Sequence, residues 1–559
     1  MHKRNTHRLW FALGAATLVA GLCKVKSRLE LSKAKYRSLT GHARMARRLA
    51  SLVPFYEFDE DRFFCSDDAP DEVAARRRDG FMRLAQLYRE RFAETRRLTA
   101  QVRENVSDLQ FTDAYRVPFQ YSRIMREFLR AGSFLKASEG VMLTDLDGNR
   151  FYDLAGSYGV NLFGYDFYKS CIEKGWERVR ALGPVLGAFH PVVADNVARL
   201  KEISGLDEVS FHMSGTEAVM QAVRLARYHT RRTHLVRFCG AYHGWWDDVQ
   251  PGVGNPMPAH ATYTLAEMSD ATLHVLRTRR DIACVLVNAI QALHPNKAAP
   301  ADGALVDSGR EASFDKEAYR AWLTELREVC TQRGIVLIFD EVFLGFRIAR
   351  GGAQEYFGVP ADLVTYGKTV GGGLPIGVMC GRRELMKRYR DDRPLDICFA
   401  RGTFNSHPSV MGAMNEFLVR LATPEIGRLY ENLDACWNSR AQDLNRRLTS
   451  EQLPVRIANF SSVWTVCYTT PSRYNWMLQY YLRAEGLALS WIGTGRIIFS
   501  LNYTDQDFEA VMDRFVAAAK AMRDDGWWWV DSGPRQVSIK RQILWETIGH
   551  LFGRSWQRK

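Results

Sequence analysis

Short apolar segments alternate with helical runs through the middle of the chain, and this alternation constrains the fold more than any other feature. The segments at 233–238, 283–288 and 334–340 are brief and rich in Val, Ile, Leu and Phe. An unbroken apolar run of this length is typical of a strand buried on both faces, and a helix between successive strands forms a crossover. The sequence therefore predicts an α/β protein whose mostly parallel sheet has helices on both faces.

A hairpin pattern marks the start of this region. Residues 141–154 hold two short strand patterns around Gly148 and Asn149, which both tolerate the positive φ of a tight turn. After about Asn415 the order changes to helix, strand, helix, and then a strand at 497–502 and a helix at 505–522. We expect five parts: an N-terminal anchor (1–28), a charged helical extension (29–116), a large catalytic domain with its N-terminal segment (117–415), a small α+β domain (416–525) and a Trp-rich basic tail (526–559).

The N-terminus is basic, then apolar, then basic. Its apolar run, residues 9–23, has fifteen residues, fewer than the roughly 20 that span a bilayer comfortably. No clear signal-peptide cleavage site precedes Lys24, so we favour a retained anchor, either a short span or an interfacial helix, over a cleaved signal or a buried helix. The expected location is cytoplasmic, with attachment to the inner membrane through the N-terminus.

The formal charge of +13 raises the question of a polyanionic partner. Lys and Arg concentrate near the termini and no nucleic-acid recognition motif accompanies them, which argues against nucleic acid and favours an anionic membrane surface. Ten cysteines are spread singly along the chain without a C-x-x-C pair. This spacing argues against a disulfide framework and against a metal site, and it fits a reducing compartment.

Two stretches outside the predicted catalytic region allow more than one interpretation. Residues 71–106 are charged, with Phe81, Leu84 and Tyr88 among the apolar residues at helical spacing. They predict an extension that packs or docks, or a solvated amphipathic helix without a function of its own, which is the alternative we favour. The tail, which begins near Trp527 and ends in a basic amphipathic stretch, predicts membrane contact or packing on the body with about equal weight.

An acid at the end of a strand and a lysine in a glycine-rich loop indicate the chemistry. The apolar strand at 334–340 ends in Asp340, which places a carboxylate at the sheet edge where open α/β sheets bind ligands. Such a carboxylate can keep a pyridine nitrogen protonated. Lys368 follows a short strand pattern and precedes the glycine run at 369–375, where an amine in a dry site becomes nucleophilic. A single lysine would more often be a solvated surface residue, so the inference depends on both residues together.

Further segments suggest contacts to a planar, phosphorylated ligand. Ser214, Gly215 and Thr216 precede a helical run, and the amides of a helix start suit a phosphate dianion, although the same residues also form an ordinary N-cap. Tyr242 is predicted to place an aromatic face on the ligand or to be a core tyrosine. Thr403 is a second phosphate contact or part of a turn.

Taken together, these segments resemble the class III, fold type I pyridoxal-phosphate aminotransferases, the group that includes glutamate-1-semialdehyde aminomutase. The resemblance covers about residues 117–522. It rests on five segments in the family's order and approximate spacing: SGTEAVMQAVRLAR, AYHG, LIFDEVFLGFR, DLVTYGKTVGGGLPIG and GTFNSHP. It implies pyridoxal 5'-phosphate as the cofactor and the fold of a type I PLP-dependent transferase.

The resemblance also implies a role for each matching residue. Lys368 corresponds to the lysine that forms the Schiff base and shuttles the proton, and Asp340 to the acid on the pyridine nitrogen. Val342 corresponds to the residue beneath the ring and Tyr242 to the one above it. The other implied cofactor contacts are Ser214, Gly215, Thr216, His243 and Thr403. Because Thr403 is implied to reach the phosphate of the neighbouring subunit's cofactor, a homodimer with shared sites is expected.

Two longer segments are similar to aminotransferase domains of polyketide and lipopeptide assembly lines. They are residues 156–166 and 351–378. That similarity implies a β-keto acyl acceptor on an acyl carrier protein. Ser157 and Tyr158, in the loop after the hairpin, are candidate acceptor contacts. Two departures from the family pattern concern the pocket: Asn288 stands where Glu is common, and Tyr165 follows Gly164 where His is usual.

The expected activity is ping-pong transfer of an amino group from an amino-acid donor to a carbonyl acceptor. Two alternatives stay open. An aminomutase would move nitrogen within one molecule with the same cofactor residues. A non-catalytic, membrane-attached scaffold would account for Asn288 and the unusual termini, but it would leave the retention of Lys368 and Asp340 without a reason.

Overall fold

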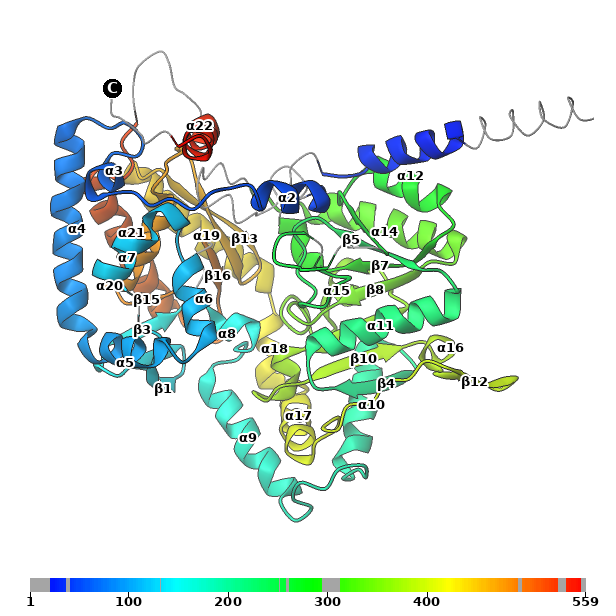
Figure 1. The fold of residues 1–559 in the computed structure, drawn as a ribbon. Helices are drawn as coiled ribbons and strands as arrows, with labels where there is room; N and C mark the ends of the chain where they lie inside the picture. The colour runs from blue at the N-terminus through cyan, green and yellow to red at the C-terminus, as the bar shows by residue number, and fades with distance from the viewer. Residues whose placement is uncertain are drawn as a thin grey trace, which may run out of the picture.

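A computed structural model gives the fold of the chain (Figure 1). It describes residues 21–36, 41–130, 132–250, 252–257, 261–293, 312–490, 495–530 and 539–553. Within these residues the largest sheet has seven strands in the order β4-β10-β9-β8-β7-β5-β6. Their bounds are β4 Glu208–His212, β5 His234–Phe238, β6 Thr262–Leu265, β7 Ile282–Val287, β8 Val336–Asp340, β9 Leu363–Gly367 and β10 Gly377–Gly381.

The seven-stranded sheet is mostly parallel. Strands β6, β5, β7, β8 and β9 pair in parallel, and β10 lies antiparallel between β9 and β4. Every residue of β7, β8 and β9 is buried, as expected for strands covered on both faces. The predicted strands at 233–238, 283–288 and 334–340 correspond to β5, β7 and β8.

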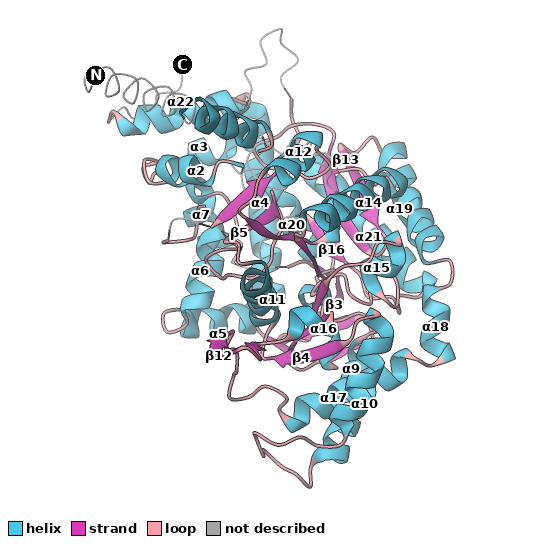
Figure 2. Cartoon of the chain, turned by 90° about the vertical axis from the view of Figure 1, so that its right-hand side faces the viewer, coloured by secondary structure: helices cyan, strands magenta, loops and turns pink. Residues whose placement is uncertain are grey.

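Helices cover the two faces of this sheet (Figure 2). Helix α11 (Gly215–Thr230) packs on β7, β8, β9 and β10, and α14 (Lys316–Arg333) packs on β8 and on α12 (Asp270–Thr278). Helices α9 (Tyr165–Val179), α10 (Val192–Ser204) and α17 (Pro408–Leu421) form a layer of their own at the β4 and β10 end. The predicted α/β class is confirmed.

Smaller sheets lie on the other side of the molecule. The predicted hairpin is present as β2 (Met142–Asp145) and β3 (Arg150–Asp153), joined by β1 (Leu135–Glu139) and by β15 (Leu487–Ala488). A second sheet contains β13 (Val455–Phe460), β14 (Val463–Tyr468) and β16 (Arg496–Ile498). The strand predicted at 497–502 is shorter than expected, because β16 ends at Ile498, whereas the helix predicted at 505–522 is α21 (Asp505–Asp524).

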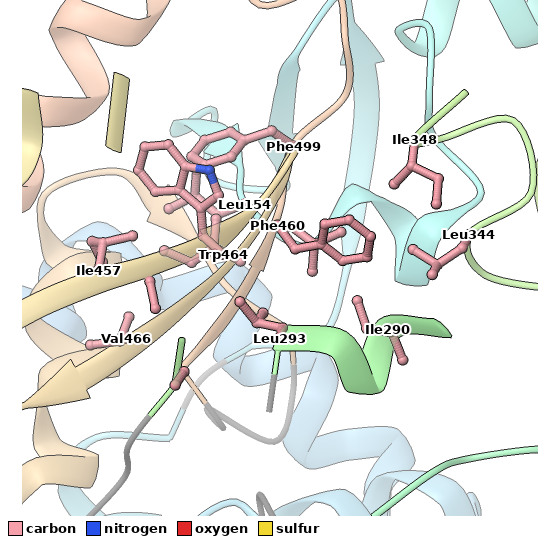
Figure 3. Close-up of a cluster of buried hydrophobic side chains, with 14 of the residues drawn as sticks. Leu154, Ile290, Leu293, Leu344, Ile348, Ile457, Phe460, Trp464, Val466 and Phe499 are labelled. Atoms are coloured by element: carbon pink, nitrogen blue, oxygen red, sulfur yellow. The ribbon is translucent and has the colours of Figure 1, made fainter. Parts of the chain in front are cut away.

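One continuous core joins these sheets to the large one. Figure 3 shows Phe460, Trp464 and Phe499 of the smaller lobe beside Leu293 and Ile290. The latter two belong to the 3-10 helix η3 (Ala289–Leu293), which directly follows β7. Because the two lobes share buried side chains, loops from both of them meet at the carboxyl ends of the parallel strands.

The N-terminal extension packs on the smaller lobe. Residues 71–106 form α4 (Asp71–Arg91) and α5 (Ala93–Arg103), and Phe81, Leu84 and Tyr88 are buried in the common core. The Tyr88 hydroxyl donates a hydrogen bond to the Tyr480 carbonyl at 3.0 Å. The favoured alternative of a solvated helix is therefore wrong, because its apolar stripe meets the apolar surface of α20 (Leu478–Ala484).

Trp527 and Trp528 also pack on the body, and both are buried. The Trp527 indole donates to the Tyr481 hydroxyl at 2.7 Å, and the Trp528 indole donates to Asn475 Oδ1 at 2.5 Å. Most of the predicted anchor, residues 1–20, lies outside the described residues. Across the part of the chain that the structure describes, no helix is both long and apolar enough to traverse a bilayer.

Candidate active site

A cavity of about 530 Å³ opens at the carboxyl ends of β4, β5, β7 and β8. Its size falls in the usual range for small-molecule sites. Its lining comes from both lobes, since Arg496 of β16 faces the loops of the large sheet. Eight of the predicted site residues line it: Ser214, Gly215, Thr216, Tyr242, His243, Asp340, Val342 and Lys368.

Asp340 is the last residue of β8, and its buried carboxylate is held by several donors. The carboxylate lies 2.7 Å from His243 Nδ1 through Oδ2, and Oδ1 accepts from the Val342 amide at 3.1 Å. Burial lowers the pKa of His243, although Asp340 opposes the shift. The ring is therefore neutral near pH 7, with its proton on Nδ1, where it donates to Asp340. His243 Nε2 is buried and has no partner among the described residues.

Lys368 stands directly after β9 in a left-handed backbone conformation, with φ of 51°, which costs a residue with a side chain roughly 1 kcal/mol. Its amine is 5.8 Å from the centre of the Phe343 ring. Burial lowers the pKa of Lys368; Asp340 opposes this change and the buried Arg347 adds to it. The described residues provide no hydrogen-bond acceptor for Lys368 Nζ. The amine is thus available as a nucleophile and base.

The start of α11 forms another wall of the cavity. Ser214 is the N-cap and accepts from the Glu217 amide at 3.3 Å, so the ordinary N-cap role is realised. The positive end of the helix dipole and the backbone of Gly215 and Thr216 face the cavity. Gly244 has φ of 93°, and a Cβ there would lie 2.4 Å from Thr216 Oγ1. Glycine is therefore required where this loop closes on the start of the helix.

These groups fit pyridoxal 5'-phosphate. A strand-end carboxylate suits the pyridine nitrogen, a buried amine of lowered pKa suits the aldehyde carbon, and a helix start suits the phosphate. Gly215 approaches Val342 so closely that a Cβ would lie 2.6 Å from its side chain. Val342 is therefore held against the start of α11 in the wall of the cavity.

Three predicted site residues lie outside this cavity. Thr403 is exposed and lines a separate surface groove with Phe189 and Arg401. Ser157 and Tyr158 line a third groove, and the Ser157 hydroxyl is 2.8 Å from the Tyr165 hydroxyl.

The loop that carries Ser157 and Tyr158 meets the Lys368 cavity through its next two residues. A Cβ on Gly159 would lie 2.7 Å from the Phe343 ring and 3.5 Å from Lys368 Cδ, and Val160 lines the cavity. Within one chain, the closest approach of this segment to the cavity therefore comes from Gly159 and Val160.

The structure adds residues that sequence reasoning did not assign to the site. Arg496 brings a guanidinium from the smaller lobe, and Phe343 and Gln291 come from loops of the large sheet. Asn288 lines the cavity and donates to the Tyr242 carbonyl at 3.3 Å. The sequence signal for Arg496 was its position at the start of an otherwise apolar strand. A charged side chain there needs a polar environment.

Comparisons with known proteins agree with this geometry. The family model for class-III aminotransferases matches residues 127–519. Glutamate-1-semialdehyde 2,1-aminomutase of Nitratidesulfovibrio vulgaris (strain DP4) is 32% identical over 397 residues, covering 68% of this chain and 90% of that protein. The same enzyme of Alkaliphilus oremlandii is 34% identical over 336 residues, covering 57% of this chain and 72% of that protein.

Solved structures share the fold. An omega-transaminase from Sphaerobacter thermophilus superimposes with a TM-score of 0.64 at 23% identity, covering 78% of this chain and 99% of that one. A glutamate-1-semialdehyde aminomutase from Pseudomonas aeruginosa PAO1 has a TM-score of 0.64 at 18% identity, covering 80% and 99%.

Proposed function

The chain belongs to the class-III aminotransferase family, and from this premise we propose that it transfers an amino group from an amino-acid donor to the carbonyl carbon of an acceptor. It is a PLP-dependent transaminase or aminomutase. The observation that carries the proposal is the convergence of Lys368 and the Asp340–His243 pair on one cavity.

Lys368 is assigned the proton transfers. Because burial lowers its pKa, a larger fraction of the amine is neutral near pH 7 than for an exposed lysine, and a neutral amine can accept a proton from the α-carbon of the donor. In the second half of the cycle, after the keto acid has left and the acceptor has bound, the same nitrogen delivers a proton to the acceptor carbon. When bound, pyridoxal 5'-phosphate supplies the electron sink that stabilises negative charge on the substrate carbon.

Asp340 and His243 are assigned to the pyridine nitrogen. The neutral imidazole donates to Asp340 Oδ2 and leaves the carboxylate its negative charge, while the Val342 amide orients Oδ1. A carboxylate fixed in this way holds a proton on an adjacent ring nitrogen. Ser214, Gly215, Thr216 and Tyr242 complete the proposed cofactor contacts.

The substrate side of the cavity is mixed in character. Val160, Ile290 and Phe343 provide apolar surface, and Arg496 provides positive charge. This combination suits a donor carboxylate together with a long-chain acceptor. We therefore propose a β-keto acyl or similar lipid or polyketide-type acceptor, presented on an acyl carrier protein and contacted by Ser157 and Tyr158.

Intramolecular transfer, as in a glutamate-1-semialdehyde aminomutase, is the second candidate. It is favoured by the names of the relatives that match the chain. Asn288 bears on the choice, because it lines the cavity at a position where the family pattern commonly has Glu. A small acidic substrate would therefore meet a neutral amide there instead of a carboxylate.

The decisive experiment tests the dependence of turnover on an external donor. The holoenzyme is mixed with glutamate, glutamine or alanine alone, and its visible absorbance and the donor's keto acid are measured. A transaminase gives a spectral change and one equivalent of keto acid without any acceptor, and a β-keto acyl thioester then restores the spectrum. Turnover of glutamate-1-semialdehyde without any donor would contradict the proposal and favour the aminomutase.

The remaining assignments are proposals as well. Thr403 is exposed and lies outside its own chain's cavity, which supports a role at the phosphate of a partner subunit and hence a homodimer. We also propose five parts with boundaries at residues 28, 116, 415 and 525, and attachment of a cytoplasmic enzyme to the inner membrane through residues 1–28. Light scattering of the holoenzyme tests the dimer directly.

A further inference from the structure

Helix α2 (Ala43–Ala50) turns its apolar side chains away from the body. None of its residues is buried. Met45 and Leu49, one turn apart, are exposed, and Leu52, Val53 and Phe55 continue the apolar surface; all five are between 43% and 73% exposed. Its contact with the body uses Ala43, which approaches Gly252, and Arg47, which donates to the Pro256 carbonyl at 2.9 Å. An amphipathic helix normally buries its apolar face, so this arrangement is the reverse of the usual one.

Helix α22 (Ile539–Leu551) has the same arrangement. Leu544, Trp545 and Leu551, together with Phe552 after the helix, are between 49% and 78% exposed, and no apolar residue of α22 is buried. The helix is held through its polar side instead, where the Glu546 carboxylate lies 2.7 Å from both Arg62 and Arg473.

The two apolar surfaces adjoin. Phe55 is followed by Tyr56, whose ring stacks on His550 of α22 with 4.2 Å between ring centres and 13° between ring planes. Figures 1 and 2 both show α2 and α22 at the same end of the molecule. We call this surface the terminal face: Met45, Leu49, Leu52, Val53, Phe55, Leu544, Trp545, Leu551 and Phe552.

Positive charge is concentrated in the two sequence segments that contain the residues of the terminal face. Residues 1–53 contain twelve Lys or Arg and one Glu, and residues 535–559 contain six Lys or Arg and one Glu. These two segments therefore carry more than the whole formal charge of +13, and the rest of the chain is slightly negative. Arg44 and Arg48 lie on α2, and Lys540 and Arg541 on α22. Glu546, the acidic residue among residues 535–559, forms ion pairs with Arg62 and Arg473.

We propose that the terminal face binds the surface of an anionic lipid bilayer. Exposed leucines and aromatics flanked by arginines and lysines match the boundary between acyl chains and anionic headgroups. The helical residues 21–33 continue this pattern at the same end, with exposed Leu22, Val25 and Leu29. The apolar run 9–20, outside the described residues, leads directly into that helix in the sequence. A folded, two-helix surface therefore supplements any attachment by residues 1–28, and it lies apart from the catalytic cavity.

The test is co-sedimentation of the full-length holoenzyme with vesicles of phosphatidylcholine, alone or mixed with phosphatidylglycerol. We expect binding that needs phosphatidylglycerol and weakens with salt. Replacement of Leu544 and Trp545 by Ser should weaken binding about tenfold, because two apolar side chains are lost from the interface. Replacement of Arg44 and Arg48 by Gln should weaken it by a similar factor. Leu395→Ser is the matched control: this leucine is 95% exposed on β12 (Arg393–Ile397), far from the terminal face (Figure 1).

Amide hydrogen exchange supplies a second readout that residues 1–20 do not influence. On phosphatidylglycerol vesicles, exchange should slow in α2 and α22, while amination turnover with a water-soluble substrate stays unchanged. Equal vesicle binding by the face variants, or unaltered exchange in α22 of the bound enzyme, would overturn the proposal. A changed oligomeric state of the variants without vesicles would overturn it too, since the face would then be a contact between copies of the chain.

Discussion

Two buried centres of charge, one in the catalytic cavity and one beneath α22, differ in how their charges are balanced. Beneath α22, Glu546 meets Arg62 and Arg473 at 2.7 Å, and all three side chains are at most 7% exposed. Burial alone would raise the pKa of Glu546, but the hydrogen bonds and charges of the two arginines outweigh it and lower the pKa. Each charge there has an opposite partner within the chain.

In the cavity the balance is incomplete. Asp340 has a neutral imidazole as its nearest donor, and the Lys368 amine has a lowered pKa because it is buried. Buried charge is costly unless it is paired. The centre beneath α22 is thus complete and serves stability, whereas the cavity needs a ligand with a basic ring nitrogen and an electrophilic carbon to complete it. The substitutions below test that contrast, from the largest expected effect to the smallest.

Lys368→Ala should abolish turnover and the visible absorbance of the attached cofactor. The described lining of the cavity contains no second lysine, so no other amine is in place. Absorbance spectroscopy and steady-state assays measure both losses. As a control, Lys174→Ala removes an exposed lysine outside the three grooves described above and should change neither. Borohydride reduction followed by peptide mapping should find the cofactor on Lys368, and attachment to a different lysine would refute the assignment.

Asp340→Asn should keep the cofactor bound but lower kcat by at least about a hundredfold, because an amide does not hold a proton on the ring nitrogen as a carboxylate does. The amide oxygen can still accept from His243, so the local fold should persist. The check compares cofactor content with kcat in the same preparation. Near-normal kcat would show that the carboxylate is not used.

Glu546→Gln should lower the free energy of unfolding by roughly 3 kcal/mol, since it removes the carboxylate that pairs with buried Arg473 and leaves buried Arg62 only the exposed Asp68. Turnover of the folded enzyme should be unchanged. Chemical denaturation followed by fluorescence measures the loss. Asp443→Asn, which breaks an exposed pair with Arg446, is the matched control and should cost less than about 0.5 kcal/mol.

The effect of Glu546→Gln should also depend on pH in a definite direction. Because the folded state lowers the pKa of Glu546, its stabilisation is present above the unfolded pKa of about 4.5 and is lost as pH falls through the folded value. Wild type and variant should therefore converge in stability in acid. A stability difference between wild type and variant that widened in acid would contradict ion pairing of Glu546 with the two arginines.

Glu341→Gln tests an acid next to Asp340 that lacks a cationic partner. Burial raises the pKa of Glu341 to about 8; the Ala353 amide donates to Oε1 at 2.5 Å, while Oε2 has no partner among the described residues. The sign is opposite to that of Glu546. The contribution of protonated Glu341 to the free energy of unfolding is fully present below the unfolded pKa and is lost as pH rises towards 8.

Measured between pH 6 and 8, wild type should therefore lose about 1 kcal/mol per pH unit relative to Glu341→Gln. Denaturant titrations of both proteins across this range provide the difference. Glu267→Gln is a companion variant, because burial also raises the pKa of Glu267 to about 8, and it should show the same trend. A difference that stays constant with pH would mean that Glu341 is ionised in the folded chain.

Local sequence pattern was sufficient for strands β5, β7, β8 and β9 of the large sheet and for much of the cavity lining, whereas β4, β6 and β10 were not predicted. The run at 334–340 is apolar on both faces, so it had to be a buried strand, and its last residue, Asp340, had to lie at the carboxyl edge. Lys368 and Ser214 could be assigned for the same reason, since each borders a recognisable strand or helix. The solvated alternative for residues 71–106 was wrong because periodicity shows that a helix has an apolar face but not whether another element covers it.

The contacts between distant segments were decided only by the tertiary structure. His243 reaches Asp340 across 97 residues and Arg62 reaches Glu546 across 484, and Arg496 enters the cavity from a different sheet. The sequence by itself determined which elements form and which of their ends carry polar groups, because backbone hydrogen bonding and side-chain periodicity act over a few residues. Packing between elements decided which charges meet, and so which buried centre is balanced within the chain and which is left for a cofactor, because burial and pairing depend on neighbours that no local pattern specifies.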